Sequence, residues 1–350
     1  MTELRLNRHR AKWAVLAGVA SVLLLQLGMN VAIDTVKPEW RDPEYGHRMK
    51  DLRRQAGANP SQPVVVVLGS SRPLMGFNPM AMGSGDGVSD PPIVYNCAQT
   101  GCGPVYELLN LKRLVAAGVK PNFVLIEIIP AVLAGKGTAE KLVPISHLGY
   151  SDVVQLEPYL AHPRALWFDW VCQRISPWYT YRIILLSHTK AANTLPSPVR
   201  RDWMWKHLQP NGWLPYTFKE IPAAKREDGI EKARAAYLPY FDQFEIAPLP
   251  DRTYRDLIAF AQSHNIRVAF FTMPESPIFR SWYPPEVRHR LANYYALLTN
   301  EFGTPVFDAT DWLADETAFA DGHHLMRHGA EAFSERFGTE CLRPWLNTNR

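Results

Sequence analysis

The chain has 350 residues, of which 47% are hydrophobic and 21% charged, values typical of a globular protein rather than a disordered one. This length fits one large domain or two small ones. The net charge of +4 is too small and too scattered to indicate nucleic-acid binding, and the 4 cysteines lack the C-x-x-C spacing of metal ligands.

The N-terminal segment has the pattern of a membrane anchor. Basic residues, among them Arg10 and Lys12, precede Trp13–Ile33, which carries no charge. About 20 apolar residues cross a bilayer as a helix, and preceding basic residues favour a cytoplasmic N-terminus. A cleaved signal peptide is the alternative, although no small-x-small site follows. We therefore expect a single-pass protein with residues 1–12 in the cytoplasm, 13–33 in the membrane and the remainder outside the cytoplasm, in the periplasm or cell envelope of a bacterium.

The segment after this anchor leads into the first strands. Residues 34–60 are polar and are expected to form a juxtamembrane linker with one short helix, Met49–Gln55. The β-branched run Val64–Leu68 predicts a strand buried on both faces of a parallel sheet. A loop rich in Gly, Ser and Pro, Gly83–Pro92, leads to a short second strand, Ile93–Asn96.

Helical and strand patterns alternate through the rest of the domain, which we place at 61–350. The further elements expected are a helix Pro104–Ala117, a strand Phe123–Ile129, a helix around Tyr254–Ala261, a strand Ile266–Thr272, a helix from Pro284 to about Leu298, a strand Pro305–Asp308 and a final helix from about His328 to Leu342. This alternation predicts an α/β fold, a three-layer α/β/α sandwich around a five-stranded parallel sheet.

Residues 131–250 interrupt the alternation and are expected to form a mostly helical insertion. Within it, Ala165–Leu186 is aromatic and partly apolar, but Asp169, Arg174 and Arg182 make it a poor membrane span. An amphipathic helix packed on the domain is the simplest interpretation, and a cap over the active site or a surface against the bilayer are alternatives. Several tryptophans could stack on sugars, with core packing as the simpler role: Trp167, Trp170, Trp178, Trp203, Trp205 and Trp213.

Two short motifs at opposite ends of the domain carry the groups of a nucleophilic hydrolase. Gly69-Ser70-Ser71 follows the first strand, so the Ser71 hydroxyl can project into the crevice at the carboxyl ends of the strands. In the second motif Asp321 stands three residues before His324, so its carboxylate can hold the imidazole ring in one orientation. We therefore expect Ser71 as nucleophile, His324 as base and Asp321 as the orienting acid.

Each motif also has a simpler interpretation by itself. A Gly-Ser-Ser sequence after a strand is commonly a turn or a phosphate-binding loop, and Asp-Gly is a turn signal. His324 and His328, four residues apart, could bind a metal ion together with Asp321. No further set of ligands accompanies them in the sequence, so neither a metal nor a cofactor is expected.

These motifs resemble the SGNH (GDSL-like) hydrolase superfamily, which has a flavodoxin-like α/β/α fold. Gly69-Ser70-Ser71 matches its first block, Gly-Asp-Ser, except for Ser70, and the last block, Asp-x-x-His, matches Asp321 and His324. Asn96–Gly101 resembles the second block, Asn-x-Gly-x-x-Gly, with an alanine in place of the first glycine. The resemblance covers roughly residues 63–130 and 252–345 of the sequence. It implies an oxyanion hole formed by the backbone N–H groups of Ser71 and Gly101.

One block departs from this pattern. After the third strand the superfamily commonly has Gly-x-Asn-Asp, whose asparagine completes the oxyanion hole, whereas this chain has Glu127-Ile128-Ile129-Pro130. Losing one oxyanion donor can reduce the rate about 100-fold or more. Either Asn96 or a group from the insertion replaces this donor, or catalysis is weak.

A membrane anchor joined to such a domain resembles envelope acyl-transfer proteins, namely the alginate O-acetyltransferases and the D-alanyl transfer protein of teichoic acid synthesis. The resemblance implies an acyl-Ser71 intermediate and a glycan or other envelope polymer as acceptor, or ester hydrolysis if water enters first. Arg72 and Glu275 face the same crevice by topology and are candidates for substrate binding, with a structural salt bridge as the alternative for Arg72. A catalytically inactive glycan-binding or scaffold protein is the alternative function.

Overall fold

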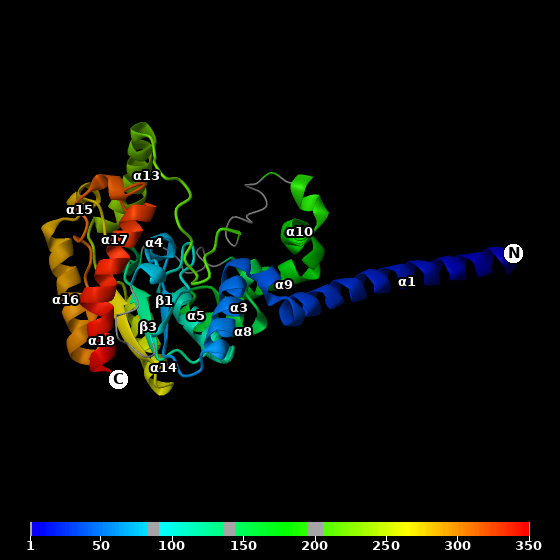
Figure 1. Ribbon diagram of the computed structural model, residues 1–350. Helices are drawn as coiled ribbons and strands as arrows, with labels where there is room; N and C mark the ends of the chain where they lie inside the picture. Colours follow the sequence, from blue (N-terminus) through cyan, green and yellow to red (C-terminus); the bar gives the residue numbers. More distant parts are fainter. Residues whose placement is uncertain (1, 83–90, 136–143, 195, 197–205, 350) are drawn as a thin grey trace.

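The computed structural model describes residues 2–82, 91–135, 144–194, 196 and 206–349. At its centre is a five-stranded parallel sheet with the strand order β2-β1-β3-β4-β5 (Figure 1). The strands are β1 (Val64–Leu68), β2 (Ile93–Asn96), β3 (Phe123–Glu127), β4 (Arg267–Phe271) and β5 (Val306–Phe307). This is one of the common orders of doubly wound α/β proteins, and it confirms the predicted fold class.

Side chains of β1 alternate between two apolar cores, one on each face of the sheet. Val64, Val66 and Leu68 pack on the first face, whereas Val65 and Val67 pack on the second. Both faces are buried, which is why the strand reads as a continuous apolar run. The first face is covered by α5 (Pro104–Ala116), α14 (Pro248–Ser263) and α16 (Pro285–Phe302), and the second by α17 (Arg327–Phe337) and α18 (Arg343–Thr348).

Several elements end elsewhere than the sequence suggests. β3 stops at Glu127, although Ile128 still donates its N–H to Phe271 O at 2.8 Å, and Pro130 then opens the short helix α6 (Pro130–Leu133). The final helix does not end at Leu342, because a wider helical turn joins α17 directly to α18. At the C-terminus, therefore, one helical segment continues into the next without a loop between them.

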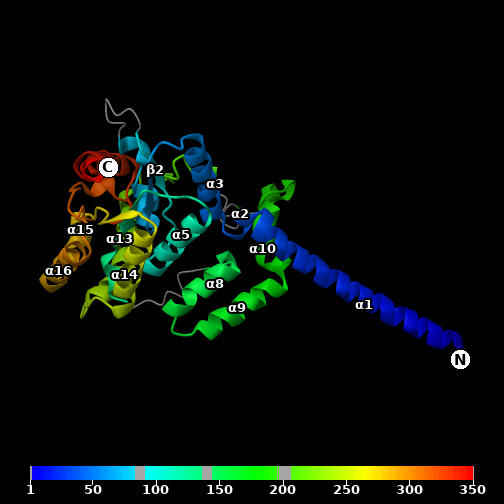
Figure 2. The same cartoon turned by 90° about the horizontal axis from the view of Figure 1, so that it is seen from below.

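The N-terminal helix α1 (Thr2–Val31) projects away from the rest of the molecule (Figures 1 and 2). The segment His9–Val36 is long and apolar enough to cross a membrane, and it contains an apolar window of 18 residues with a mean hydropathy of 1.9. Only 6% of this apolar window is buried inside the protein, so α1 is not a core helix. Its exposed apolar side chains need a partner outside the sheet domain.

Residues 34–60 are more ordered than the linker we expected. A short helix α2 (Pro38–Arg41) is followed by α3 (Pro43–Ala58), which is much longer than the predicted Met49–Gln55. Asp42 caps α3 by accepting the N–H of Tyr45, and the proline at its first position fixes the helical backbone angle. Met49 and Leu52 are buried in the core of the first face, so α3 packs against the sheet domain.

The described part of the insertion is mostly helical, with α8 (Tyr150–Leu156), α9 (Pro163–Ile175), α10 (Pro177–Ser187) and α13 (Ala223–Phe241). Two of the tryptophans, Trp167 and Trp170, pack against the core, and Trp213 is buried with its Nε1–H donated to Met75 O. Trp178 is half exposed, while Trp203 and Trp205 lie outside the described residues. Helix α10 lies beside the end of α1, and α9 reaches α1 near its own C-terminal end (Figure 2).

Candidate active site

The turn after β1 holds Ser71 at the carboxyl end of the sheet. Ser71 is the first residue of α4 (Ser71–Gly76), and the preceding Ser70 caps this helix by accepting the Arg72 N–H at 3.1 Å. The Ser70 N–H donates to Glu127 Oε2 at 2.7 Å, which ties the turn to the end of β3. A Cβ at Gly69 would lie 2.7 Å from Glu127 Cβ, so only glycine allows this close approach.

A second turn, before α17, holds Asp321 and His324. Gly322 has a φ of 90°, a conformation that favours glycine, and its carbonyl accepts the N–H of Ser276 at 2.9 Å. The Asp321 carboxylate accepts the backbone N–H of His324 at 2.9 Å, and Ala320 N–H donates to His324 O at 2.8 Å. These bonds fix the relative position of the two side chains.

The two turns bring Ser71, His324 and Asp321 into one hydrogen-bonded chain. Ser71 Oγ lies 2.8 Å from His324 Nε2, and His324 Nδ1 lies 2.7 Å from Asp321 Oδ2. A neutral imidazole with its proton on Nδ1 satisfies both contacts, because it donates to Asp321 and accepts from Ser71. Burial opposes ionisation of Asp321, but the hydrogen bonds from the side chain and backbone of His324 outweigh it and lower the pKa of this carboxyl.

His323, next to the proposed base, has a different environment. Its ring is buried against Tyr237 and Phe279, with centroid distances of 4.9 and 5.4 Å. Burial and the neighbouring His324 lower the pKa of His323, so this ring stays neutral in the folded protein. Its Nδ1 is 3.2 Å from Asp321 Oδ1 but is not aligned for a hydrogen bond. His323 therefore adds no positive charge beside His324.

Arg72 and Glu275 are buried in the protein rather than exposed in the crevice as we expected. Arg72 Nη2 donates to Glu275 Oε1 at 2.9 Å, and both side chains are almost fully buried. Glu275 also accepts the hydroxyl of Tyr283, and Glu127 Oε1 lies 3.8 Å from Arg72 Nε. Although burial disfavours the charge of Arg72, the two carboxylates raise the pKa of this side chain above its ordinary value. The structure thus has the salt bridge that was the alternative for Arg72, and it corrects the substrate-binding prediction.

The predicted oxyanion donors differ in their surroundings. The Ser71 N–H is at the first position of α4, where a helix offers no internal acceptor. Gly101 lies in an exposed turn after β2, with a φ of 72°. Asn96 is fully buried, and its Nδ2 donates to the carbonyls of Pro73 and Phe77, each at 2.8 Å. Both amide hydrogens of Asn96 are therefore engaged in holding α4, which corrects its prediction as an oxyanion donor.

In the sequence, Glu127 stands out only as a departure from the pattern of the resembled superfamily. Its carboxylate in fact supports the turn that carries Ser71, and burial raises the pKa of Glu127. An acidic residue at the end of the otherwise apolar β3 was the signal that could have identified it.

The insertion also borders the site, as the alternative of a cap over it anticipated, but through α13 rather than through the segment Ala165–Leu186. Arg226 of α13 donates from Nε to Phe319 O at 3.1 Å, and a Cβ on Gly229 would lie 3.0 Å from Asp321 Cβ. On the other side, Leu214 N–H donates to Leu74 O at 3.2 Å. The described parts of the insertion near the site are therefore α13 and the segment before it, whereas α10 lies beside α1.

The same cluster has the composition of a metal site. Ligand atoms of Asp321, His323 and His324 all lie within 4.8 Å of one another, and His328 is not part of this group. Both ring nitrogens of His324, however, already contact Ser71 and Asp321. The observed arrangement therefore fits proton transfer at Ser71 better than metal ligation.

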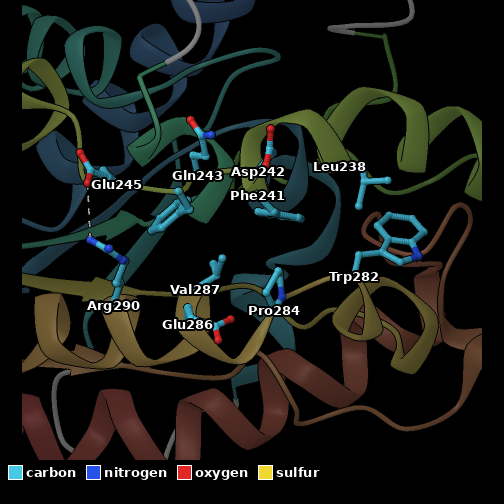
Figure 3. A pocket seen from close by; sticks show the side chains of 11 residues that line it. Leu238, Phe241, Asp242, Gln243, Glu245, Trp282, Pro284, Glu286, Val287 and Arg290 are labelled. Carbon is cyan, nitrogen blue, oxygen red and sulfur yellow. Dashed lines mark ion pairs between the residues drawn. The ribbon is translucent and has the colours of Figure 1, made fainter.

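A groove of about 830 Å³ lies between the end of α13 and the start of α16 (Figure 3). The ion pair between Arg290 and Glu245 crosses it, with a nitrogen–oxygen distance of 3.9 Å. Ser71 does not line this groove. Phe279 lies between the groove residue Trp282 and the ring of His323, so the groove is separated from the hydrogen-bonded chain.

No family model matches this chain, and no curated protein matches it either. Among solved structures, one that it resembles is the crystal structure of a "putative acylhydrolase" from Bacteroides fragilis NCTC 9343. The two chains share 11% sequence identity, the match covers 85% of this chain and 96% of that chain, and the TM-score is 0.36.

Proposed function

We propose that this chain is a membrane-anchored serine esterase or O-acyltransferase that acts on acyl esters of an envelope glycan or a similar substrate. The observation that carries the proposal is the continuous hydrogen-bonded chain from Ser71 through His324 to Asp321, with links of 2.8 and 2.7 Å. A serine hydroxyl becomes a useful nucleophile only when such a base is held in one orientation.

The proposed reaction has two halves. His324 Nε2 removes the proton of Ser71 while Oγ bonds to the ester carbonyl carbon, whose oxygen takes up the negative charge. The N–H groups of Ser71 and Gly101 are the proposed donors to that oxygen. Protonated His324 then gives its proton to the leaving alcohol as the C–O bond breaks. In the second half, water or an acceptor hydroxyl gives its proton to His324 and bonds to the acyl carbon. The bond between that carbon and Ser71 Oγ then breaks, and His324 returns the proton to Ser71.

Labelling by a fluorophosphonate and turnover of p-nitrophenyl acetate test this proposal together. Wild-type protein should be labelled and should release p-nitrophenol, and Ser71→Ala should lose both, because the attacking oxygen is gone. Ser263→Ala, at an exposed serine on α14, is the matched control and should keep both. Labelling of Ser71→Ala at the wild-type level would exclude Ser71 as the nucleophile.

A catalytically inactive glycan-binding or scaffold protein is a second candidate, and one observation favours it. Asn96 is committed to α4 and the end of β3 bears Glu127, so the proposed oxyanion hole has two backbone donors. In this case the wild type would show neither labelling nor turnover, while the fold and the Ser71–His324 contact would remain.

The proposed location follows from α1. Because His9–Val36 can span a bilayer and basic residues precede it, the proposed topology has the N-terminus in the cytoplasm and the sheet domain outside, in the periplasm or envelope of a bacterium. Esters on envelope polymers would be within reach of a domain held there.

A further inference from the structure

Helix α9 exposes an apolar stripe that the fold does not cover. Phe168, Val171, Cys172 and Ile175 have the spacing i, i+3, i+4 and i+7, so they lie on one side of the helix. All four are exposed, Phe168 by 69% and Ile175 by 66%. The opposite side of α9, with Leu166, already packs on the core. The stripe is therefore a second apolar face that needs its own partner.

The start of α10 extends this stripe with two aromatic side chains. Trp178 and Tyr179 are exposed by 50% and 65%. The guanidinium of Arg182 lies over the ring of Tyr179 at 3.9 Å from its centroid. Tryptophan and tyrosine with a neighbouring arginine are the side chains that gather at the boundary between lipid and water.

Contacts with α1 fix the position of this face relative to the proposed membrane span. Asn30 Nδ2 donates to Arg174 O at 2.8 Å, and Trp178 N–H donates to Gln26 Oε1 at 3.5 Å. Arg174 also pairs with Asp34, the first charged residue after the apolar stretch. Gln26 and Asn30, the two amide side chains of that stretch, are thus bound to α10 and α9, which we call the α9–α10 pair.

These contacts set the depth of Trp178 relative to the membrane surface. Gln26 precedes Asp34 by eight residues, so at about 1.5 Å per residue Trp178 meets α1 roughly 12 Å before the first charge. Helices at a membrane surface insert their apolar face by about 5–10 Å. Helix α10 also runs crosswise to α1 (Figure 1), as a helix in the plane of a bilayer crossed by α1 would.

We propose that an interfacial patch on α9 and α10 inserts into the lipid leaflet where α1 leaves the membrane. The patch consists of Phe168, Val171, Cys172, Ile175, Trp178 and Tyr179. The patch rests on the membrane anchor proposed above, but not on the chemistry of Ser71. The sheet domain then has two attachments to the bilayer, α1 and the patch, and its orientation is fixed.

Cys172 provides the test, because it lies in the patch and the other cysteines, Cys97, Cys102 and Cys341, are buried. A nitroxide attached to Cys172 in the full chain, reconstituted in lipid nanodiscs, should be shielded from a water-soluble paramagnetic reagent and accessible to oxygen dissolved in lipid. A nitroxide at Ser263→Cys in a Cys172→Ser background is the matched control and should show the opposite pattern. A water-accessible probe at Cys172 would overturn the proposal.

Two further probes separate the possible failures. A nitroxide at Leu16→Cys, again with Cys172→Ser, reports on α1 itself. Lipid access at position 16 with water access at position 172 would overturn the patch alone, whereas water access at both would overturn the anchor. Shielding of position 172 from both reagents would mean that protein covers the patch, which also overturns a lipid contact.

Phe168→Glu with Ile175→Glu should raise the water access of the Cys172 probe while p-nitrophenyl acetate turnover stays at the wild-type level.

Discussion

His323 illustrates how two adjacent histidines receive different roles from their surroundings. The ring of His324 lies within hydrogen-bond distance of Ser71, whereas the ring of His323 packs against Tyr237 and Phe279. Only the histidine three residues after Asp321 has its Nδ1 hydrogen-bonded to that carboxylate. The Asp-x-x-His spacing therefore distinguished the two rings, because in this turn only the histidine three residues after Asp321 donates its Nδ1–H to the carboxylate.

Folding stability should depend on pH through His323. Unfolded His323 takes up a proton as the pH falls below about 6.5, while the folded protein, with a lowered pKa, keeps the ring neutral. The unfolded state then binds more protons, so the free energy of unfolding should decrease as the pH falls from 7 to about 5. His323→Phe keeps the ring contacts without a titrating group and should weaken this decrease in urea unfolding. The exposed His207→Gln should keep the wild-type dependence, and an unchanged slope in His323→Phe would contradict the assignment.

At the scale of elements, the turn from β1 to α4 depends on a buried charge. Arg72→Met would leave Glu275 and Glu127 buried without their cation, and breaking a buried ion pair in this way costs about 3–5 kcal/mol. Urea unfolding should show this loss, whereas the exposed Arg288→Met should not. If Arg72 instead bound substrate, its replacement would raise KM for p-nitrophenyl acetate and leave the unfolding midpoint unchanged.

The sequence predicted elements best where one property dominated the local pattern. β1 and β2 were predicted with the observed bounds because their apolar, β-branched runs are bounded by Pro, Gly and polar residues. Helix α3 was largely missed, since it buries only a few side chains, among them Met49 and Leu52, within a polar sequence. Topology placed Arg72 and Glu275 at the correct edge of the sheet. The sequence pattern did not show that the two side chains meet below the protein surface, where they form a buried ion pair.

The candidate site shows the same limit. Ser71, Asp321 and His324 could be predicted to meet because parallel strands end at one edge, and the structure brings them together. Their catalytic role stays a prediction. The engagement of Asn96 with α4 depends on two backbone carbonyls whose directions no local pattern encodes.

At the scale of the whole molecule, Arg174 connects α9 to the end of α1. Its guanidinium pairs with Asp34, donates to Leu148 O at 2.9 Å and lies over the Trp170 ring. Arg174→Met should therefore increase hydrogen–deuterium exchange in α9 and α10 in nanodiscs, while β1 and β3 remain protected. Arg182→Met is the matched control, because Arg182 contacts Tyr179 on its own helix. Equal exchange in both variants would mean that Arg174 does not hold α9 and α10 in place.

The contacts between α1 and the α9–α10 pair would also affect how the protein meets the proposed substrate. A domain tethered by one helix alone can rotate about that helix, so its site sweeps many directions and heights. If the proposed anchor and the proposed patch both hold the domain, Ser71 would lie at one fixed height above the lipid. Encounters would then depend on how many acyl groups occur per unit area of envelope within that reach, as expected when tethering sets the effective concentration of a partner. The geometry of the anchor, as much as the shape of the site, would select which esters are processed.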